Sequence, residues 1–375
     1  MQDNVEHGTL KDEPVPEATP EQDKATEGTT RHFGPLDLER LVELDFVRTT
    51  EAAALNACRW FGKGDPLKAR AAAVDAMRGT LDLTCVSATV IFGDGLNQQP
   101  DGIVPGEKLG NWIEESLKME LATIPIDGIN LVANGLWGAM SVMVAAYSVG
   151  DQSALMNIPC RHMEKIAYGP AVAAGPGQLH LNASVRDNLE IIAMKLKKRA
   201  QDLNVAVLDR KRHESLIEDI RRANASVRLF KEGEIAACIA PSLLATDIDV
   251  FMGTGGSAET VLAAAALKCL GGDVIARIAP ESEQEKLNVI EKLGEQALNN
   301  LYCSEDLARG DRIIFCATGI SHGSILKGIH VDGNTAFTYS VVMRARYRTV
   351  RKIAATHDLS VKTIRLRSAG AEAKL

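Results

Sequence analysis

The segment 124–130, Ile-Pro-Ile-Asp-Gly-Ile-Asn, combines an acid with a tight turn at the end of an apolar run. Asp127 at such a strand end could hold a cation, and the backbone N–H groups around Gly128 could face a phosphate. The same residues are also typical of an ordinary Pro-x-Asp-Gly turn. The segment therefore indicates cation or phosphate chemistry only if other segments point the same way.

A second segment, 253–259, reads Gly-Thr-Gly-Gly-Ser-Ala-Glu and predicts a glycine-rich loop between a strand at 248–252 and a helix. Glycine lets a backbone approach an anion closely, and a helix N-terminus favours negative charge. Glu259, in the first turn of that helix, could equally complement the helix dipole. The segment is thus either an anion-binding loop or a plain strand-to-helix connection.

A third segment, 208–213, reads Leu-Asp-Arg-Lys-Arg-His and follows a predicted strand at 205–208. Arg210 and Arg212 could bind a phosphate at the carboxyl edge of a parallel sheet, and a solvated basic turn is the alternative. A further run, 344–348, has Arg at every other position. That run predicts the exposed face of a strand or, alternatively, a strip that contacts phosphate.

The elements expected to position these segments change character along the chain. In the first half, helices predicted at 38–61 and 66–77 alternate with strands predicted at 86–92, 121–126 and 140–147 in an α+β manner. The second half alternates regularly, which predicts a largely parallel sheet with right-handed crossovers. Its predicted strands are 205–208, 227–230, 248–252 and 312–316, and its predicted helices are 185–200, 213–224, 233–240 and 258–270.

These patterns divide the chain into four expected parts. Residues 1–35 are polar and rich in Pro and Glu, so they cannot bury enough apolar surface to offset chain entropy, and they predict a disordered acidic tail. An α+β domain is expected at 36–184 and an α/β domain at 185–358. Residues 359–375 are expected to form a C-terminal tail.

The bulk composition narrows the function classes. Hydrophobic residues make up 46% of the 375 positions and charged residues 24%, as in an ordinary globular protein. The net charge of −7 excludes a global attraction to nucleic acid, and no apolar run reaches the length of a membrane span. The seven cysteines form no C-x-x-C pair. We therefore expect reduced thiols, an intracellular location in the cytoplasm or an organelle stroma or matrix, and neither nucleic-acid binding nor membrane insertion.

Taken together, the segments resemble the class II fructose-1,6-bisphosphatases of bacteria, within the lithium-sensitive phosphomonoesterase superfamily. The resemblance extends over about residues 38–358 and implies the five-layered α/β/α/β/α sugar-phosphatase fold and a homo-oligomer. It implies a metal-site remnant in 36–184 and sugar-phosphate-binding loops in 185–358. The matching stretches are 48–54, 60–65, 73–77, 106–110, 163–165, 169–170, 209–213, 253–259 and 317–320.

Carboxylates bind Mg²⁺ or Mn²⁺ in this family, and the resemblance implies that several of those positions are changed here. Arg70 and Ile124 stand where the family has aspartates, and Ile129 stands where it has the threonine that orients the attacking water. A hard divalent ion needs several oxygen ligands, most of them anionic. We therefore expect a degenerate metal site and no cofactor, with Mg²⁺ or Mn²⁺ only if hydrolysis is retained. The remnant metal ligands are Asp94, Asp127 and Glu259.

The sugar-phosphate side of the resemblance is better preserved. Arg210 and Arg212 match the basic turn of the family, and Glu232 and Glu234 match an Asp-Gly-Asp motif with each acid one carbon longer. His162 stands where the family has a tyrosine. The residues expected to contact a sugar phosphate are Asp127, Gly128, His162, Arg210, Arg212, Glu232, Glu234 and Gly256.

These positions predict a class II fructose-1,6-bisphosphatase-like protein that is catalytically impaired or inactive. It would act as a sugar-phosphate-binding regulator or as a structural subunit of an assembly. The alternative is a working metal-dependent fructose-1,6-bisphosphatase of gluconeogenesis or the reductive pentose cycle. Under the first interpretation, Arg70 would serve as a surrogate cation bonded to Asp94, Asp127 or Glu259.

Overall fold

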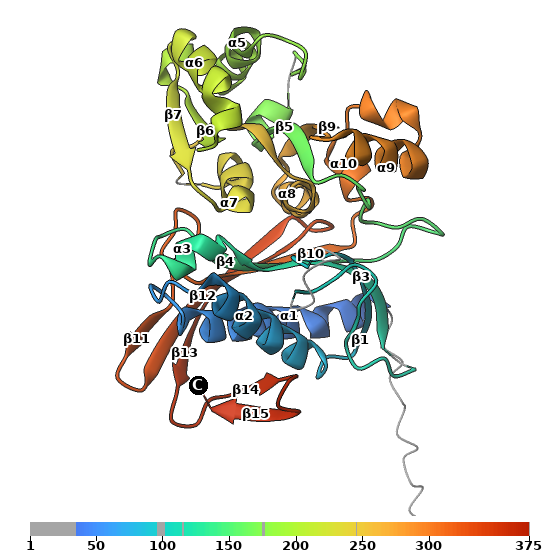
Figure 1. Cartoon of the computed structure of the whole chain (residues 1–375), viewed down its shortest axis with the longest axis vertical. Coiled ribbons are helices and arrows are strands. Elements are labelled where there is room, and N and C mark those ends of the chain that lie inside the picture. The colour runs from blue at the N-terminus through green and yellow to red at the C-terminus, as the bar shows by residue number, and fades with distance from the viewer. Residues whose placement is uncertain (1–34, 96–101, 115, 175–176, 245, 375) are drawn as a thin grey trace, which may run out of the picture.

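Helices and sheets alternate in layers in the computed structural model of the chain (Figure 1). Within the described part of the chain, no helix is both long enough and apolar enough to cross a membrane. The predicted tail 1–35 lies outside that part, apart from its last residue. The structure describes residues 35–95, 102–114, 116–174, 177–244 and 246–374.

The larger sheet has eight strands in the order β11-β12-β10-β4-β3-β1-β2, with β13 paired to β12. β1 and β3 are parallel, whereas β4 pairs antiparallel with β3 and β10, and β10 with β12. The strands after residue 312 thus complete a sheet that the first half begins, so the predicted domains 36–184 and 185–358 do not each have a sheet of their own. The strands are β1 (Val86–Phe92), β2 (Lys108–Leu109), β3 (Leu117–Asp127), β4 (Met140–Ala146), β10 (Ile313–Gly319), β11 (His330–Asp332), β12 (Thr335–Arg344) and β13 (Thr349–Asp358).

The smaller sheet has five strands in the order β7-β6-β8-β5-β9. β6 runs parallel to β7 and β8, but β5 runs antiparallel to β8 and β9. The expectation of a largely parallel sheet is therefore right for one side of this sheet and wrong for the other. The strands are β5 (His162–Tyr168), β6 (Asn204–Leu208), β7 (Ser226–Phe230), β8 (Val250–Gly256) and β9 (Asp273–Ile278).

Three of the apolar cores in the described part of the chain hold most of the helices on these sheets. One core lies between the larger sheet and helices α1 and α2 and includes Phe46 and Met77. The second lies between the two sheets and centres on α7 and α8, and the third packs α5 and α6 on the smaller sheet. The order is thus helices, sheet, helices, sheet, helices, as the α/β/α/β/α expectation required (Figure 1). The helices are α1 (Pro35–Cys58), α2 (Pro66–Leu81), α3 (Ile129–Ala133), α4 (Pro170–Ala173), α5 (Val185–Leu196), α6 (Glu214–Arg222), α7 (Glu234–Ile239), α8 (Ser257–Leu270), α9 (Glu283–Leu293) and α10 (Ser304–Leu307).

Helix α8 lies between the sheets because its sequence is apolar on every side. Its centre reads Val-Leu-Ala-Ala-Ala-Ala-Leu, and all seven of these residues are buried. A helix that is apolar all round belongs inside a protein, and alanine side chains allow close approach from both faces. The preceding strand, β8, belongs to the smaller sheet and ends directly before α8, at the site described below.

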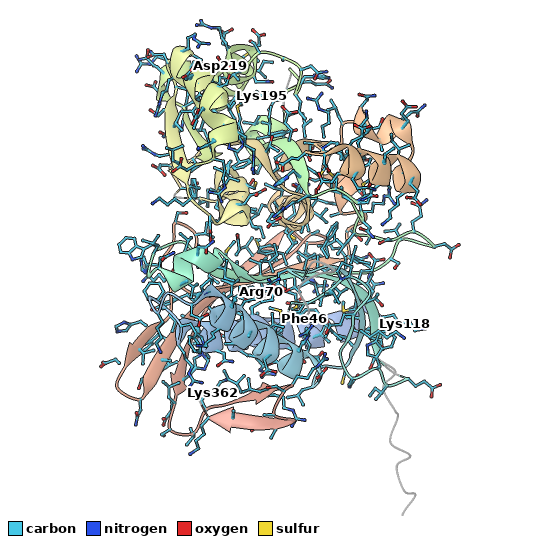
Figure 2. The ribbon with its side chains drawn as sticks, in the orientation of Figure 1. Phe46, Arg70, Lys118, Lys195, Asp219 and Lys362 are labelled. Carbon is cyan, nitrogen blue, oxygen red and sulfur yellow. The ribbon has the colours of Figure 1, made fainter. Side chains whose placement is uncertain are left out.

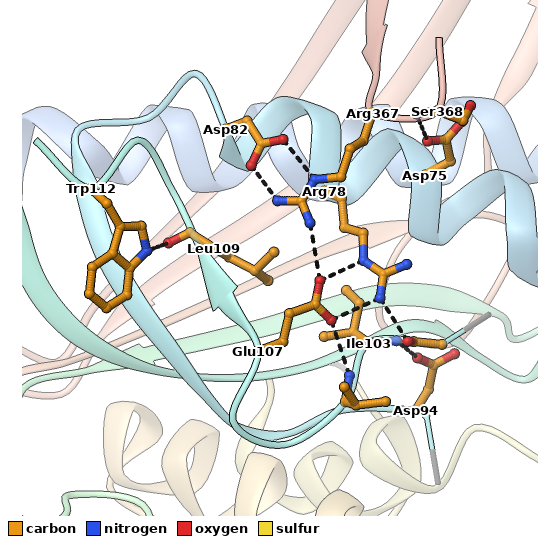
Figure 3. A network of polar contacts seen from close by, with 12 residues as sticks. Asp75, Arg78, Asp82, Asp94, Ile103, Glu107, Leu109, Trp112, Arg367 and Ser368 are labelled. Atoms are coloured by element: carbon orange, nitrogen blue, oxygen red, sulfur yellow. Dashed lines mark hydrogen bonds and ion pairs between the residues drawn. The ribbon is translucent and has the colours of Figure 1, made fainter. Parts of the chain in front are cut away.

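The C-terminal segment is not an isolated tail. Strands β14 (Thr363–Leu366) and β15 (Ala371–Lys374) form a hairpin, and the side chain of Ile364 is buried. Arg367, at the turn, pairs with Asp82 and donates to Glu107 (Figure 3). The expectation of a tail at 359–375 is therefore corrected, because these contacts fix the hairpin against α2.

Two local predictions also need correction. Residues 253–256 do not form a loop but are the end of β8, paired with β5. Gly253 has a φ of 146°, and a Cβ there would lie 3.0 Å from the His213 ring. The run 344–348 is not a strand face either, because β12 ends at Arg344 and the chain then turns, with Arg348 at a φ of 48°.

Candidate functional site

Arg70 and Asp94 form an ion pair where α2 faces the end of β1. Asp65 caps α2 by accepting from the Lys68 amide, and Pro66 occupies its first turn. Arg70 Nε lies 2.6 Å from Asp94 Oδ2, and the side chains are only 12% and 15% exposed. Burial raises the pKa of Asp94, and the Arg70 charge and the Ile103 amide oppose that rise.

Asp127 ends β3 and is buried beneath the start of α7. Its Oδ2 accepts a hydrogen bond from the Ile235 amide at 3.3 Å. Burial raises the pKa of Asp127 well above its usual value, and the nearby charges of Glu259, Glu234 and Glu232 raise it further. The fold therefore brings Asp127 close to three acids that follow it by more than 100 residues in the sequence.

Lys165 is a buried cation among these acids. The ammonium group pairs with Glu234 and donates to Thr260 Oγ1 at 2.5 Å and to the Gly256 carbonyl at 3.3 Å. The other oxygen of Glu234 accepts from the Gly256 amide at 3.0 Å. A buried carboxylate is tolerated when it is paired and its lone pairs are satisfied, and both conditions hold for Glu234.

The two glycines at the end of β8 make room for the acids. A Cβ on Gly255 would lie 2.2 Å from the Glu234 carboxylate, and one on Gly256 would lie 1.8 Å from Glu259. Burial, followed by the charge of Glu234, raises the pKa of Glu259 to about 7, with Lys165 opposing the rise. Any larger residue at these positions would push an acid out of place.

Glu232 connects the two sheets from the other side. It accepts from the Asn130 amide at 3.0 Å and from the Asn130 side chain at 2.5 Å. These bonds join the segment before α7 to the start of α3, directly after Gly128, which has a φ of 97°. Glu232 thus has a bonding role that its match to a sugar-binding motif did not predict.

The basic side chains lie near the edge of the smaller sheet. Arg212 donates twice to the Thr254 carbonyl, at 3.0 and 3.1 Å. His162 Nδ1 lies 3.1 Å and Arg212 Nη1 lies 3.9 Å from Glu281 Oε1. Burial lowers the pKa of His162. Arg210 is exposed and donates to the Asp209 carbonyl.

His213 anchors this basic turn. Its Nε2 accepts from the Thr254 amide at 2.8 Å, and its Nδ1 lies 2.7 Å from the Leu208 carbonyl. The hydrogen bond from the Thr254 amide fixes Nε2 as the acceptor, so Nδ1 carries the proton and the ring is neutral. Burial correspondingly lowers the pKa of His213.

Ile124 and Ile129, on either side of Asp127, carry no side-chain oxygen, and Asp94 is bonded to Arg70. Among residues 35–95, 102–114, 116–174, 177–244 and 246–374, no three or more His, Cys, Asp or Glu side chains are arranged to hold a metal ion.

The structure brings the predicted site residues together only in part. Asp127, Glu232, Glu234, Gly256 and Glu259 form one cluster. His162 and Arg212 form a second group, linked to the first by β8. Sequence reasoning missed Lys165 as a site residue. Its signal was the stretch 163–165, which had counted only toward the resemblance.

Known proteins resemble this chain over most of its length. The family model described as bacterial fructose-1,6-bisphosphatase, glpX-encoded, matches residues 40–357. The chain belongs to the class 2 fructose-1,6-bisphosphatase family. A relative from Haemophilus influenzae, named fructose-1,6-bisphosphatase class 2, is 36% identical over 333 residues, which cover 86% of this chain and 97% of the relative. A Synechococcus relative, named D-fructose 1,6-bisphosphatase class 2/sedoheptulose 1,7-bisphosphatase, is 32% identical over 341 residues, covering 85% and 96%. The layered fold is the one expected of this family.

Proposed function

We propose that this chain is a sugar-phosphate-binding member of the class 2 fructose-1,6-bisphosphatase family in which metal-dependent hydrolysis is weak or lost. The observation that carries the proposal is the surroundings of Asp127. Its carboxylate is buried, and the neighbouring positions 124 and 129 are both isoleucine. A divalent ion that activates water needs several oxygen donors at one point, and this turn offers one carboxylate.

The sugar-phosphate half supports binding. Arg212 is anchored on the Thr254 carbonyl, and about a third of its side chain is exposed toward solvent. Arg210 lies two residues away, and His162 pairs with the end of β8. Arg side chains held in this way suit the bidentate contacts that phosphates take. Such a ligand would act as a regulator's signal or would order a subunit within an assembly.

The second candidate is a working fructose-1,6-bisphosphatase, and the names of the relatives favour it. In that case Asp94, Asp127 and Glu259 would hold Mg²⁺ or Mn²⁺ after side-chain rearrangement. The ion pair of Asp94 with Arg70 would first have to open. Metal binding and phosphate release therefore separate the two candidates.

The deciding experiment combines two measurements on the purified chain. Phosphate release from fructose 1,6-bisphosphate is followed with 1 mM Mn²⁺ or Mg²⁺, and fructose 6-phosphate binding is followed by calorimetry. We expect turnover below about 0.01 s⁻¹, well under the usual enzyme range, together with saturable binding. Turnover above about 1 s⁻¹ would establish the second candidate, and absence of both turnover and binding would leave only a structural role.

We further propose a homo-oligomer and an intracellular location. All seven cysteines are free thiols, and Cys160, Cys238, Cys269 and Cys316 are buried, as expected in a reducing compartment. We also propose that residues 36–184 contain the metal-site remnant and that residues 185–358 contain the sugar-phosphate-binding loops. Light scattering of the purified chain tests the oligomer, and fractionation of the source cells tests the location.

A further inference from the structure

Arg70 lies on α2 where that helix packs beneath the larger sheet (Figure 2). Its guanidinium bonds both the side chain and the main-chain carbonyl of Asp94. The remaining carboxylate oxygen, Oδ1, accepts from the Ile103 amide at 3.0 Å. Both oxygens of Asp94 therefore have protein donors.

The surrounding backbone is shaped to admit the guanidinium. A Cβ on Gly102 would lie 2.6 Å from Arg70 Nη2, so only glycine leaves this space. About two turns further along α2, Arg78 donates to the Gly102 carbonyl at 2.8 Å and pairs with Glu107 (Figure 3). Two arginines from one helix thus contact residues 94, 102 and 107, which lie between β1 and β2.

We propose that Arg70 is a resident cation that replaces a divalent metal ion at Asp94, so that the end of β1 is held against α2 without metal. This inference rests on the proposed function, because Arg70 and the Ile103 amide already bond the two oxygens of the Asp94 carboxylate. The replacement makes the fold of this chain independent of metal. It also makes the chain metal-responsive once the arginine is removed.

Burial separates this pair from an ordinary surface salt bridge. The Arg70 and Asp94 side chains are 12% and 15% exposed, whereas Lys68 and Asp65 on the same helix are 64% and 33% exposed. Removing one partner of a buried pair leaves an uncompensated charge, and removing one partner of an exposed pair has little effect. Lys68 is therefore a matched control for Arg70.

The test is thermal unfolding of the full chain with and without 1 mM Mn²⁺. We expect no Mn²⁺ effect on the wild type. Arg70→Ala should lower Tm by about 3–6 °C. Arg70→Asp should lower it further, and Mn²⁺ should return most of that loss by binding the new carboxylate together with Asp94. Lys68→Asp should change Tm by less than about 1 °C and should show no response to Mn²⁺.

Other results overturn the inference. It is wrong if Arg70→Ala melts like the wild type, or if Mn²⁺ raises the Tm of the wild type as much as that of Arg70→Asp. If Arg70→Asp does not fold, the milder Arg70→Asn is used, and failure of Mn²⁺ to stabilise it relative to the wild type also rejects the inference. Because melting does not depend on turnover, phosphate release from the wild type tests the proposed function separately.

Discussion

Buried acids in the two parts of the site, one around Asp94 and one around Glu234 and Glu259, are stabilised by different neighbouring groups. Around Asp94, a cation from a neighbouring helix bonds the acid. Around Glu234 and Glu259, a buried ammonium, Lys165, and two glycines keep the acids within reach of backbone donors. In the first part, Asp94 is bonded by Arg70. In the second part, Arg212 and His162 lie at the strand ends of the smaller sheet.

The two parts differ in which cation lies beside the acids, Arg70 at Asp94 and Lys165 at Glu234. Asp127 and Glu259 retain carboxylates, yet burial and repulsion from neighbouring acids raise the pKa of each. An acid in such surroundings favours its protonated form unless a cation arrives. Whether a carboxylate is a ligand therefore depends on which cation the fold supplies, and here it supplies Arg70 and Lys165.

Removing the buried ammonium should have the largest effect. Lys165→Met leaves Glu234 buried without its ion-pair partner, so we expect a loss of about 3–5 kcal/mol in the free energy of unfolding, measured by urea denaturation. Lys198→Met removes an exposed partner of Asp249 and should cost less than about 1 kcal/mol. Equal losses in the two variants would mean that Lys165 only fills space.

Restoring the family's residues at positions 70, 124 and 129 should increase metal-dependent phosphate release. The triple variant Arg70→Asp/Ile124→Asp/Ile129→Thr returns two carboxylates and the hydroxyl to the positions that the resemblance identifies. We expect phosphate release from fructose 1,6-bisphosphate with Mn²⁺ to rise at least about 100-fold over the wild type. Lys68→Asp serves as the control for added charge on α2. No gain in the folded triple variant would contradict the proposal that these three positions limit hydrolysis.

The acid cluster should make stability fall as pH rises. Between the ordinary Glu value of 4.5 and the pKa of about 7 in the fold, the native state binds more protons at Glu259 than the unfolded chain does. The free energy of unfolding then decreases with increasing pH across this window, by about 3 kcal/mol in total.

The matching variant is Glu259→Gln, which cannot ionise. Its stability should change less than that of the wild type between pH 5 and pH 7.5 in the same urea titrations. Parallel pH profiles of the two proteins would show that Glu259 has no raised pKa.

Removing the charge of Arg212 should have the smallest effect. Arg212→Gln keeps a hydrogen-bond donor but removes the charge, so we expect calorimetric affinity for fructose 6-phosphate to fall about 10-fold. Arg186→Gln, on the exposed face of α5, should bind like the wild type. An unchanged affinity in Arg212→Gln would move the phosphate contact to another residue, with Arg210 the nearest candidate.

Much of the fold could be predicted because the signals are local. Pro66 after Asp65 marks the start of α2, and β-branched runs mark β1 and β6. The prediction failed where pairing partners decide the conformation. Residues 253–256 look like a glycine loop, but β5 pairs with them along their length and makes them a strand. Arg344 lies in a strand and Arg348 in a turn, although both belong to one alternating run.

The sequence by itself determined the family, the order of the layers and the residue types at each motif position, since these follow from short patterns and from similarity over most of the chain. Ile124, Ile129 and Arg70 could be identified there as departures. Only the tertiary structure decided which cation meets which acid. Arg70 meets Asp94 across 24 residues, and Lys165 meets Glu234 across 69. Such contacts depend on how helices dock on sheets, and no local pattern in the chain encodes that docking.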